Sequence, residues 1–331
     1  MKAPFPWMGG KSRAADIIWR RFGDVPNYVE PFAGSLAVLL ARSGVIGTET
    51  VNDADCYLAN FWRALRLDSD AVAKWADGPV NECDLLARHR WLAKQTDFQK
   101  RMKADPDFHD AKIAGWWVWG LCAWIGSGWC VQRREGDQPS QIPHLGSAGA
   151  GINRRLPHLG DAGRGDSSEH QKRPHLMTKG KGLNAANRGP IYDYFDALSD
   201  RLRKVRVCCG DWTRVLGESV TITHGITAVL LDPPYSQSER GDCYSVETDC
   251  SAAVREWAIA NGGNPLLRIA LCGYEGEHAM PSDWECVAWK ASGGYGSQSN
   301  GRGRENCKRE RIWFSPNCIR PDSARQGDFF S

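Results

Sequence analysis

Short apolar runs alternate with longer stretches of helical spacing in two parts of the chain. Each run ends in a polar or glycine-rich turn, which is typical of a strand that leaves a buried sheet. The runs predict strands at residues 28–30, 50–52, 205–209, 228–231, 268–272, 286–289 and 311–314. Helical spacing lies between some of them, at residues 35–42, 54–67, 192–203 and 251–261. Strands that alternate with helices predict an α/β fold.

Changes in composition divide the chain into segments. The alternation of strands and helices is confined to two parts, which we expect to form one sheet-based domain that is split in the sequence. Between them, residues 68–130 have a helical pattern, and residues 131–190 are rich in Gly, Pro, Arg and His. The predicted segments are 1–67, 68–190, 191–318 and 319–331.

A short repeat marks the loop-rich part of the central segment. The tetrapeptide Pro-His-Leu-Gly at 143–146 recurs at 157–160, and Pro-His-Leu returns at 174–176. These repeats could be recurrent turns in a flexible loop. A histidine metal site is less favoured, because no carboxylate or cysteine holds metal-ligand spacing with them.

The interpretation we favour for the loop-rich part is an arm that faces DNA. Residues 131–190 hold ten Lys and Arg against five Asp and Glu. Basic side chains there would contact phosphates, and the turns would let the chain follow a groove. The candidate DNA-binding residues are Arg133, Arg134, Arg154, Arg155, Arg164, Lys172 and Arg173.

Net charge, cysteine content and apolar stretches indicate the cellular setting of the protein more than its function. The formal net charge of +3 does not by itself demand a nucleic-acid partner. The twelve cysteines include no Cys-x-x-Cys, and residues 1–7 lack the apolar core of a signal peptide. We therefore expect reduced thiols, a cytosolic setting and no metal. The most apolar stretch, 115–130, is shorter than the roughly 18 residues of a membrane span, so no membrane partner is expected.

Two further groups of residues leave alternatives open. The tryptophans of the apolar stretch are expected to be core first, although some could face DNA. They are Trp116, Trp117, Trp119, Trp124 and Trp129. Basic residues near the C-terminus predict either a solvated hairpin or phosphate contacts. They are Arg302, Arg304, Lys308, Arg309 and Arg311.

The motif with the most chemistry is Asp232-Pro233-Pro234-Tyr235, at the end of an apolar run. A carboxylate and free backbone carbonyls accept hydrogen bonds from an amino group. Proline has no N–H, so it leaves nearby carbonyls free and holds them rigidly. A tyrosine can stack on a flat ring. These four residues are therefore suited to bind the exocyclic amino group of a nucleobase.

A second motif is the turn Glu30-Pro31-Phe32-Ala33-Gly34 between a predicted strand and helix. Glycine lets a ligand approach the backbone closely. A dinucleotide site would need three glycines, so NAD binding is not expected. Asp53 follows the next predicted strand, where an acidic residue can accept ribose hydroxyls.

Two other predicted turns, at residues 7–11 and 209–212, each contain an aromatic side chain and a charged side chain. Trp7 and Lys11 flank two glycines, and Lys11 could pair with a carboxylate of a ligand. Asp211 and Trp212 follow a predicted strand and could bind an adenine amino group and its ring. Because Asp53, Asp211 and Asp232 all follow predicted strands, we expect three carboxylates along one edge of the sheet.

In this order, the motifs resemble those of Dam-type DNA adenine methyltransferases. The motifs are Trp-x-Gly-Gly-Lys at 7–11, Glu-Pro-Phe-Ala-Gly-Ser at 30–35, Asn-Asp at 52–53, Cys-Gly-Asp at 209–211 and Asp-Pro-Pro-Tyr at 232–235. The resemblance covers residues 5–66 and about 205–316. The central segment is similar to that of phage-borne members, which would place the protein in a bacterial or phage-infected cell.

The resemblance implies a fold and a division of the segments. The fold would be a Rossmann-like methyltransferase sheet of seven mostly parallel strands. Residues 1–67 and 191–318 would form the catalytic domain, and 68–190 an inserted helical and loop-rich DNA-recognition domain. The donor would be S-adenosylmethionine and the substrate double-stranded DNA; the oligomeric state is left open.

It also implies roles for the motif residues. Trp7 and Lys11 would line the methionine end of the donor, and residues 30–34 would form the loop under it. Asp53 would hold the ribose, and Asp211 with Trp212 the adenine. Two positions depart from the family's pattern: Leu36 stands where Gly is frequent, and Trp212 where Phe is frequent.

Together these inferences predict methylation of the adenine N6 amino group in a base flipped out of the duplex. Tyr235 would stack on the base, while the Asp232 carboxylate and the Pro233 carbonyl accept its amino hydrogens. The methyl group would then be transferred in line, without a covalent enzyme intermediate. The alternatives are methylation of the cytosine N4 amino group and a non-catalytic DNA-binding protein on the same fold.

Overall fold

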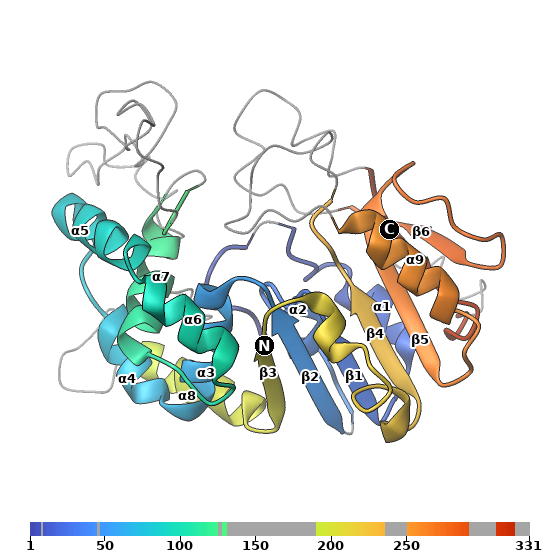
Figure 1. The fold of residues 1–331 in the computed structure, drawn as a ribbon, viewed down its shortest axis with the longest axis horizontal. Coiled ribbons are helices and arrows are strands. Elements are labelled where there is room, and N and C mark those ends of the chain that lie inside the picture. The colour runs from blue at the N-terminus through green and yellow to red at the C-terminus, as the bar shows by residue number, and fades with distance from the viewer. Residues whose placement is uncertain are drawn as a thin grey trace.

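The computed structural model places a twisted sheet at the centre of the chain, with helices on both faces and a group of helices at one edge (Figure 1). It describes residues 1–7, 9–44, 47–124, 128–130, 190–235, 250–290 and 309–321. All statements about the structure below concern these residues.

The sheet has seven strands in the order β3-β2-β1-β4-β5-β7-β6. The strands are β1 (Asn27–Glu30), β2 (Thr48–Asp53), β3 (Val205–Cys209), β4 (Thr227–Leu231), β5 (Leu267–Tyr274), β6 (Glu285–Ala288) and β7 (Glu310–Phe314). The first five strands pair in parallel, and β7 runs antiparallel between β5 and β6. The expectation of a Rossmann-like sheet of seven mostly parallel strands is confirmed.

The helices connect the strands and extend one side of the fold. They are α1 (Ala15–Phe22), α2 (Ala37–Leu40), α3 (Cys56–Leu67), α4 (Ser69–Ala76), α5 (Glu82–Ala93), α6 (Thr96–Ala104), α7 (Ala111–Ala123), α8 (Pro190–Leu202) and α9 (Ser251–Asn261). Helices α3 to α8 lie beyond β3 in Figure 1. The helical pattern predicted for residues 68–130 is therefore present up to Ala123, whereas the domain boundaries stay predictions.

Two helices differ from the sequence-based expectation. Helix α1 was not predicted, although Ala14, Ile18 and Phe22 recur on its buried face. Helix α2 is shorter than the predicted 35–42. Leu36 has a left-handed backbone conformation (φ 54°), which a helix interior does not allow, so α2 begins only after it.

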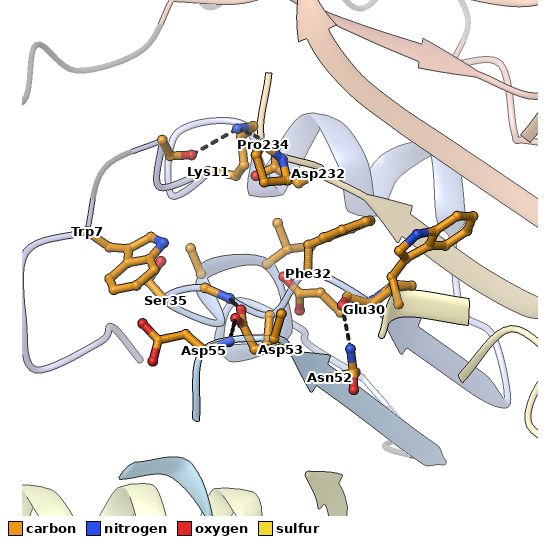
Figure 2. Close-up of a pocket in the computed structure, with 18 of the residues that line it drawn as sticks. Trp7, Lys11, Glu30, Phe32, Ser35, Asn52, Asp53, Asp55, Asp232 and Pro234 are labelled. Carbon is orange, nitrogen blue, oxygen red and sulfur yellow. Dashed lines mark hydrogen bonds and ion pairs between the residues drawn. The ribbon is translucent and has the colours of Figure 1, made fainter. Parts of the chain in front are cut away.

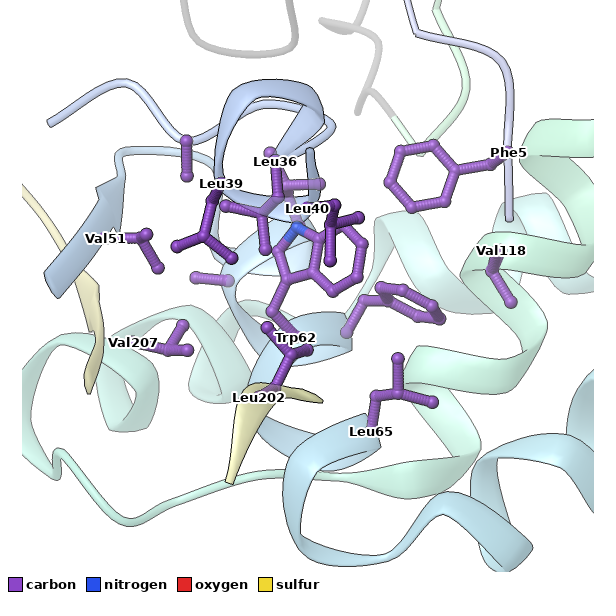
Figure 3. Packing of buried hydrophobic residues seen from close by; sticks show 14 of the residues in the cluster. Phe5, Leu36, Leu39, Leu40, Val51, Trp62, Leu65, Val118, Leu202 and Val207 are labelled. Atoms are coloured by element: carbon purple, nitrogen blue, oxygen red, sulfur yellow. The ribbon is translucent and has the colours of Figure 1, made fainter. Parts of the chain in front are cut away.

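The main core joins the sheet to the helices at its edge. Trp62 of α3 is fully buried and packs near Leu36 and Leu39 of the loop and helix after β1 (Figure 3). Four tryptophans of the apolar stretch are buried in this cluster, at positions 117, 119, 124 and 129. Trp116 is half-buried. The core interpretation of these tryptophans is thus confirmed for all but Trp116.

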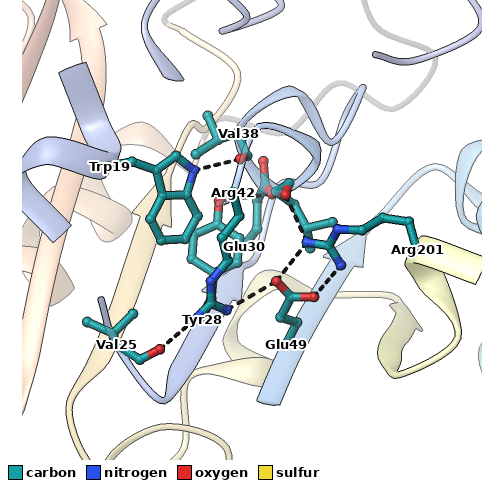
Figure 4. A network of polar contacts seen from close by, with 9 residues as sticks. Trp19, Val25, Tyr28, Glu30, Val38, Arg42, Glu49 and Arg201 are labelled. Atoms are coloured by element: carbon teal, nitrogen blue, oxygen red, sulfur yellow. Dashed lines mark hydrogen bonds and ion pairs between the residues drawn. The ribbon is translucent and has the colours of Figure 1, made fainter. Parts of the chain in front are cut away.

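A buried polar network ties α2 and α8 to the sheet (Figure 4). The Glu49 carboxylate of β2 binds the Arg42 guanidinium at 3.1 Å and the Arg201 guanidinium at 2.7 Å. Arg201 also donates to the Leu39 carbonyl (2.9 Å), and Trp19 donates to the Val38 carbonyl (2.7 Å). Since Leu39 and Val38 belong to α2, the network fixes the helix that follows the loop after β1.

The ten cysteines that the structure describes are free thiols, and most are buried. Cys83 and Cys286 are exposed. This agrees with the expectation of reduced, mostly buried thiols.

Candidate active site

A cavity of about 330 Å³ lies where the strand order reverses between β1 and β4. At such a point neighbouring loops diverge at the carboxyl ends of parallel strands and leave room for a ligand. The lining residues are Trp7, Gly9, Gly10, Lys11, Glu30, Pro31, Phe32, Ala33, Gly34, Ser35, Ala37, Val38, Asn52, Asp53, Ala54, Asp55, Gly210, Asp211, Trp212, Asp232, Pro234 and Cys250. Figure 2 shows Lys11 and Asp232 on one side of the cavity and Asp53 and Asp55 on the other.

The loop after β1 forms the floor of the cavity and is held by its neighbours. The Gly34 amide donates to Asp53 Oδ2 (3.0 Å), and the Gly34 carbonyl accepts from the Trp62 indole (3.1 Å). Gly34 has a positive φ of 48°, and a Cβ there would lie 2.8 Å from the Trp7 indole nitrogen. Glycine is therefore required at this position for both its backbone conformation and its lack of a side chain.

Asp53 is the main organiser of the loops around the cavity. Its two carboxylate oxygens accept from the amides of Gly34 (3.0 Å) and Asp55 (2.9 Å). Burial, together with the nearby Asp55 carboxylate, raises the pKa of Asp53 to about 7. Much of its hydrogen-bonding capacity is thus used to join the loops after β1 and β2, and the ribose contact predicted for it would use the remaining lone pairs.

Two lining residues in or just after β2, Asn52 and Asp55, were not singled out from the sequence as site residues. The Asn52 side chain donates to the carbonyls of Pro31 (3.1 Å) and Gly210 (3.0 Å), so it joins the loops after β1 and β3. Asp55 caps α3 by accepting from the Tyr57 amide (2.8 Å). The capping role of Asp55 could have been predicted from the sequence, since an acidic residue directly before an apolar helix is typical of an N-cap.

Aromatic rings line the part of the cavity near β3. The rings of Phe32 and Trp212 are stacked, with centroids 6.1 Å apart and an interplanar angle of 25°. Asp211 is exposed beside them and accepts from the Thr213 amide (2.9 Å). This arrangement offers a flat apolar surface next to a carboxylate.

Lys11 and Asp232 form an ion pair on the opposite side. Lys11 Nζ lies 2.8 Å from Asp232 Oδ1 and donates to the Gly9 carbonyl (2.9 Å). Lys11 is almost fully buried, which alone would lower the pKa of its ammonium group. The carboxylates of Asp232 and Glu310 outweigh burial and raise that pKa, so Lys11 is charged. Lys11 therefore pairs with Asp232 in this structure, rather than standing free for the carboxylate of a ligand.

Tyr235 lies behind the cavity wall. Its ring is 7% exposed and contacts the Tyr274 ring edge-on, with centroids 4.6 Å apart. Its hydroxyl donates to Glu310 Oε2 (2.8 Å). Of the fourteen catalytic and cofactor-binding residues predicted from the sequence, twelve line the cavity, and the two that do not are Pro233 and Tyr235.

The predicted DNA-binding residues lie outside the described residues. This holds for Arg133, Arg134, Arg154, Arg155, Arg164, Lys172 and Arg173, and for the Pro-His-Leu repeats. Of the basic residues near the C-terminus, Arg311 pairs with Glu275 at 2.8 Å and Arg309 lies over the Tyr274 ring, whereas Arg302, Arg304 and Lys308 are also outside.

Among the described residues, no three His, Cys, Asp or Glu side chains are grouped closely enough to hold a metal ion. No described helix has both the length and the apolar composition needed to cross a bilayer.

Comparison with known proteins agrees with the geometry of the cavity. No curated protein matches the chain. Residues 7–100 match the family model of the D12 class N6 adenine-specific DNA methyltransferases. The matched span contains the loop after β1 and the end of β2, and the same cavity is completed by Asp211 and Asp232 from beyond it. A D12 class N6 adenine-specific DNA methyltransferase domain is therefore detected at residues 7–100, and the members of that family methylate adenine in DNA.

Proposed function

We propose that the chain transfers a methyl group from S-adenosylmethionine to N6 of a flipped adenine at specific sites in double-stranded DNA. One observation carries the proposal: motifs from distant parts of the sequence line one cavity, with Asp232 on one side and Asp211 and Trp212 on the other. This supports a donor site that ends at the amino-binding motif.

The residues that line the cavity suit the chemical groups of S-adenosylmethionine. The rings of Phe32 and Trp212 would hold the adenine of the donor, and the Asp211 carboxylate its amino group. Acidic residues at strand ends suit ribose hydroxyls and a positively charged sulfonium. When bound, the donor supplies an electrophilic methyl group.

The chain's own residues would prepare the target amino group. The Asp232 carboxylate and the Pro233 carbonyl would accept its two hydrogens, which makes the nitrogen lone pair available and stabilises positive charge that develops there. Lys11 holds one oxygen of Asp232, so the second oxygen would take the adenine amino hydrogen.

The proposal also covers the contacts with DNA and the cellular compartment in which the protein acts. We propose that the basic part of the insertion, residues 131–190, contacts phosphates and contributes to the choice of target site. A DNA substrate and free thiols support action in the cytoplasm of a bacterial or phage-infected cell. The relation to phage-borne members stays a prediction.

The test is Asp232→Ala, assayed for transfer of labelled methyl groups to unmethylated DNA. Loss of the amino-group acceptor should lower the rate about 100-fold or more. Glu218→Ala removes an exposed carboxylate that does not line the cavity and should leave the rate unchanged. Transfer by Asp232→Ala at a rate close to that of the unchanged protein would refute the assigned role.

A further inference from the structure

We propose that Glu310 is a positioning residue that fixes Tyr235, and through it the Asp232–Tyr235 segment, for methyl transfer. The proposal rests on the proposed function. Glu310 begins β7, far along the chain from the amino-binding motif, and it does not line the cavity. Its side chain is 5% exposed.

The geometry connects Glu310 to the motif by one hydrogen bond. The Tyr235 hydroxyl donates to Glu310 Oε2 at 2.8 Å. Tyr274, which is paired with Glu310 across β5 and β7, packs edge-on against the Tyr235 ring. The Tyr235 ring is thus held at its edge and at its hydroxyl by two strands other than the one that precedes it.

The other end of the motif is held in the same way. Lys11 binds Asp232 at 2.8 Å, and its ammonium group lies 5.2 Å from the centre of the Tyr235 ring. The four residues of the motif are therefore fixed at their first and last positions, by Lys11 and Glu310. Such fixation is what keeps two hydrogen-bond acceptors at the spacing that an amino group requires.

A buried carboxylate is a costly way to hold a tyrosine for stability alone. Burial disfavours the charged form and raises the pKa of Glu310, while Lys11 and the Tyr235 hydroxyl act in the opposite direction. A neutral acceptor or an apolar pair would avoid this cost. A buried carboxylate between a charged lysine and the motif tyrosine is therefore more typical of a functional site than of a core.

The experiment compares Glu310→Ala, Glu310→Gln and Tyr235→Phe in methylation of unmethylated genomic DNA. Loss of the fixed ring should lower kcat by about tenfold or more for Glu310→Ala. The KM and Kd for S-adenosylmethionine should stay within about twofold, since Glu310 does not line the cavity. Glu310→Gln keeps an oxygen acceptor and should retain kcat within about threefold.

A double-mutant cycle separates positioning from a general structural role. In the Tyr235→Phe background the hydroxyl is absent, so Glu310→Ala should have little further effect on kcat. Glu275→Gln changes a nearby carboxylate that is 63% exposed and pairs with Arg311, and it should behave like the unchanged protein. Thermal unfolding of each variant verifies that it is folded.

Three results would overturn the proposal. They are an unchanged kcat for Glu310→Ala, an equal loss with and without the Tyr235 hydroxyl, and a Glu310→Gln variant as slow as Glu310→Ala. These differ from failure of the proposed function, in which the unchanged protein itself would transfer no methyl group to DNA, and which would overturn both.

Discussion

Two neighbouring residues in the loop after β1 have a left-handed backbone conformation, and each is tolerated for a different reason. Gly34 pays no steric cost for its φ of 48°. Leu36 (φ 54°) does carry a cost, about 1–2 kcal/mol. Its side chain is fully buried beside Trp62, and burial of a leucine offsets about that much. The loop is therefore shaped by backbone conformation at both positions.

Substitution of Gly34 should weaken donor binding. In Gly34→Ala the new Cβ would meet the Trp7 indole nitrogen at 2.8 Å and add strain at a positive φ. The Trp7 ring must then shift, and because Trp7 lines the cavity we expect the Kd for S-adenosylmethionine to rise about tenfold or more, with a loss of stability of about 1–2 kcal/mol. Calorimetric titration and thermal unfolding measure the two effects.

Gly263→Ala is the matched control for this prediction. A Cβ at Gly263 meets nothing within 4 Å, and the residue does not line the cavity. Donor affinity should be unchanged in this variant. If Gly34→Ala also bound the donor with unchanged affinity, the loop would not form the donor site.

At the scale of elements, strands were more predictable than helices. All seven strands were placed within two residues of their ends, because each is a short apolar run bounded by turns. The start of α2 and the existence of α1 were not predicted, since the first depends on the backbone at Leu36 and the second on a buried face that mixes apolar residues with Arg21. The local pattern thus locates buried strands well and these two short helices poorly.

The placement of α2 depends on Glu49. Glu49→Ala would leave Arg42 and Arg201 in the interior without their counter-charge; their side chains are 1% and 10% exposed. Loss of one partner from a buried ionic network costs about 3–5 kcal/mol. We expect a loss of this size in the free energy of unfolding, measured by urea denaturation.

The control for Glu49 is Glu218→Ala. Glu218 is exposed, and its side chain makes none of the hydrogen bonds or ion pairs described for the fold. Its substitution should change the free energy of unfolding by less than about 0.5 kcal/mol. Equal stability of Glu49→Ala and the unchanged protein would show that the network does not hold α2 in place.

At the scale of the whole molecule, the site combines residues from both ends of the chain. The motifs predicted which carboxylates meet at the sheet edge, because carboxyl ends of parallel strands share an edge. They could not predict that Lys11 pairs with Asp232 or that Tyr235 binds Glu310, since both contacts join residues far apart in sequence. Such partners are determined by tertiary packing and carry no local signal.

The most direct test of the central claim is the identity of the methylated nucleoside. Unmethylated duplex DNA is incubated with the protein and isotopically labelled S-adenosylmethionine, digested to nucleosides and examined by mass spectrometry. The account predicts label in N6-methyladenine, and about 100-fold less of it when Asp232→Ala replaces the unchanged protein. Label in N4-methylcytosine, or no label in DNA from the unchanged protein, would contradict it.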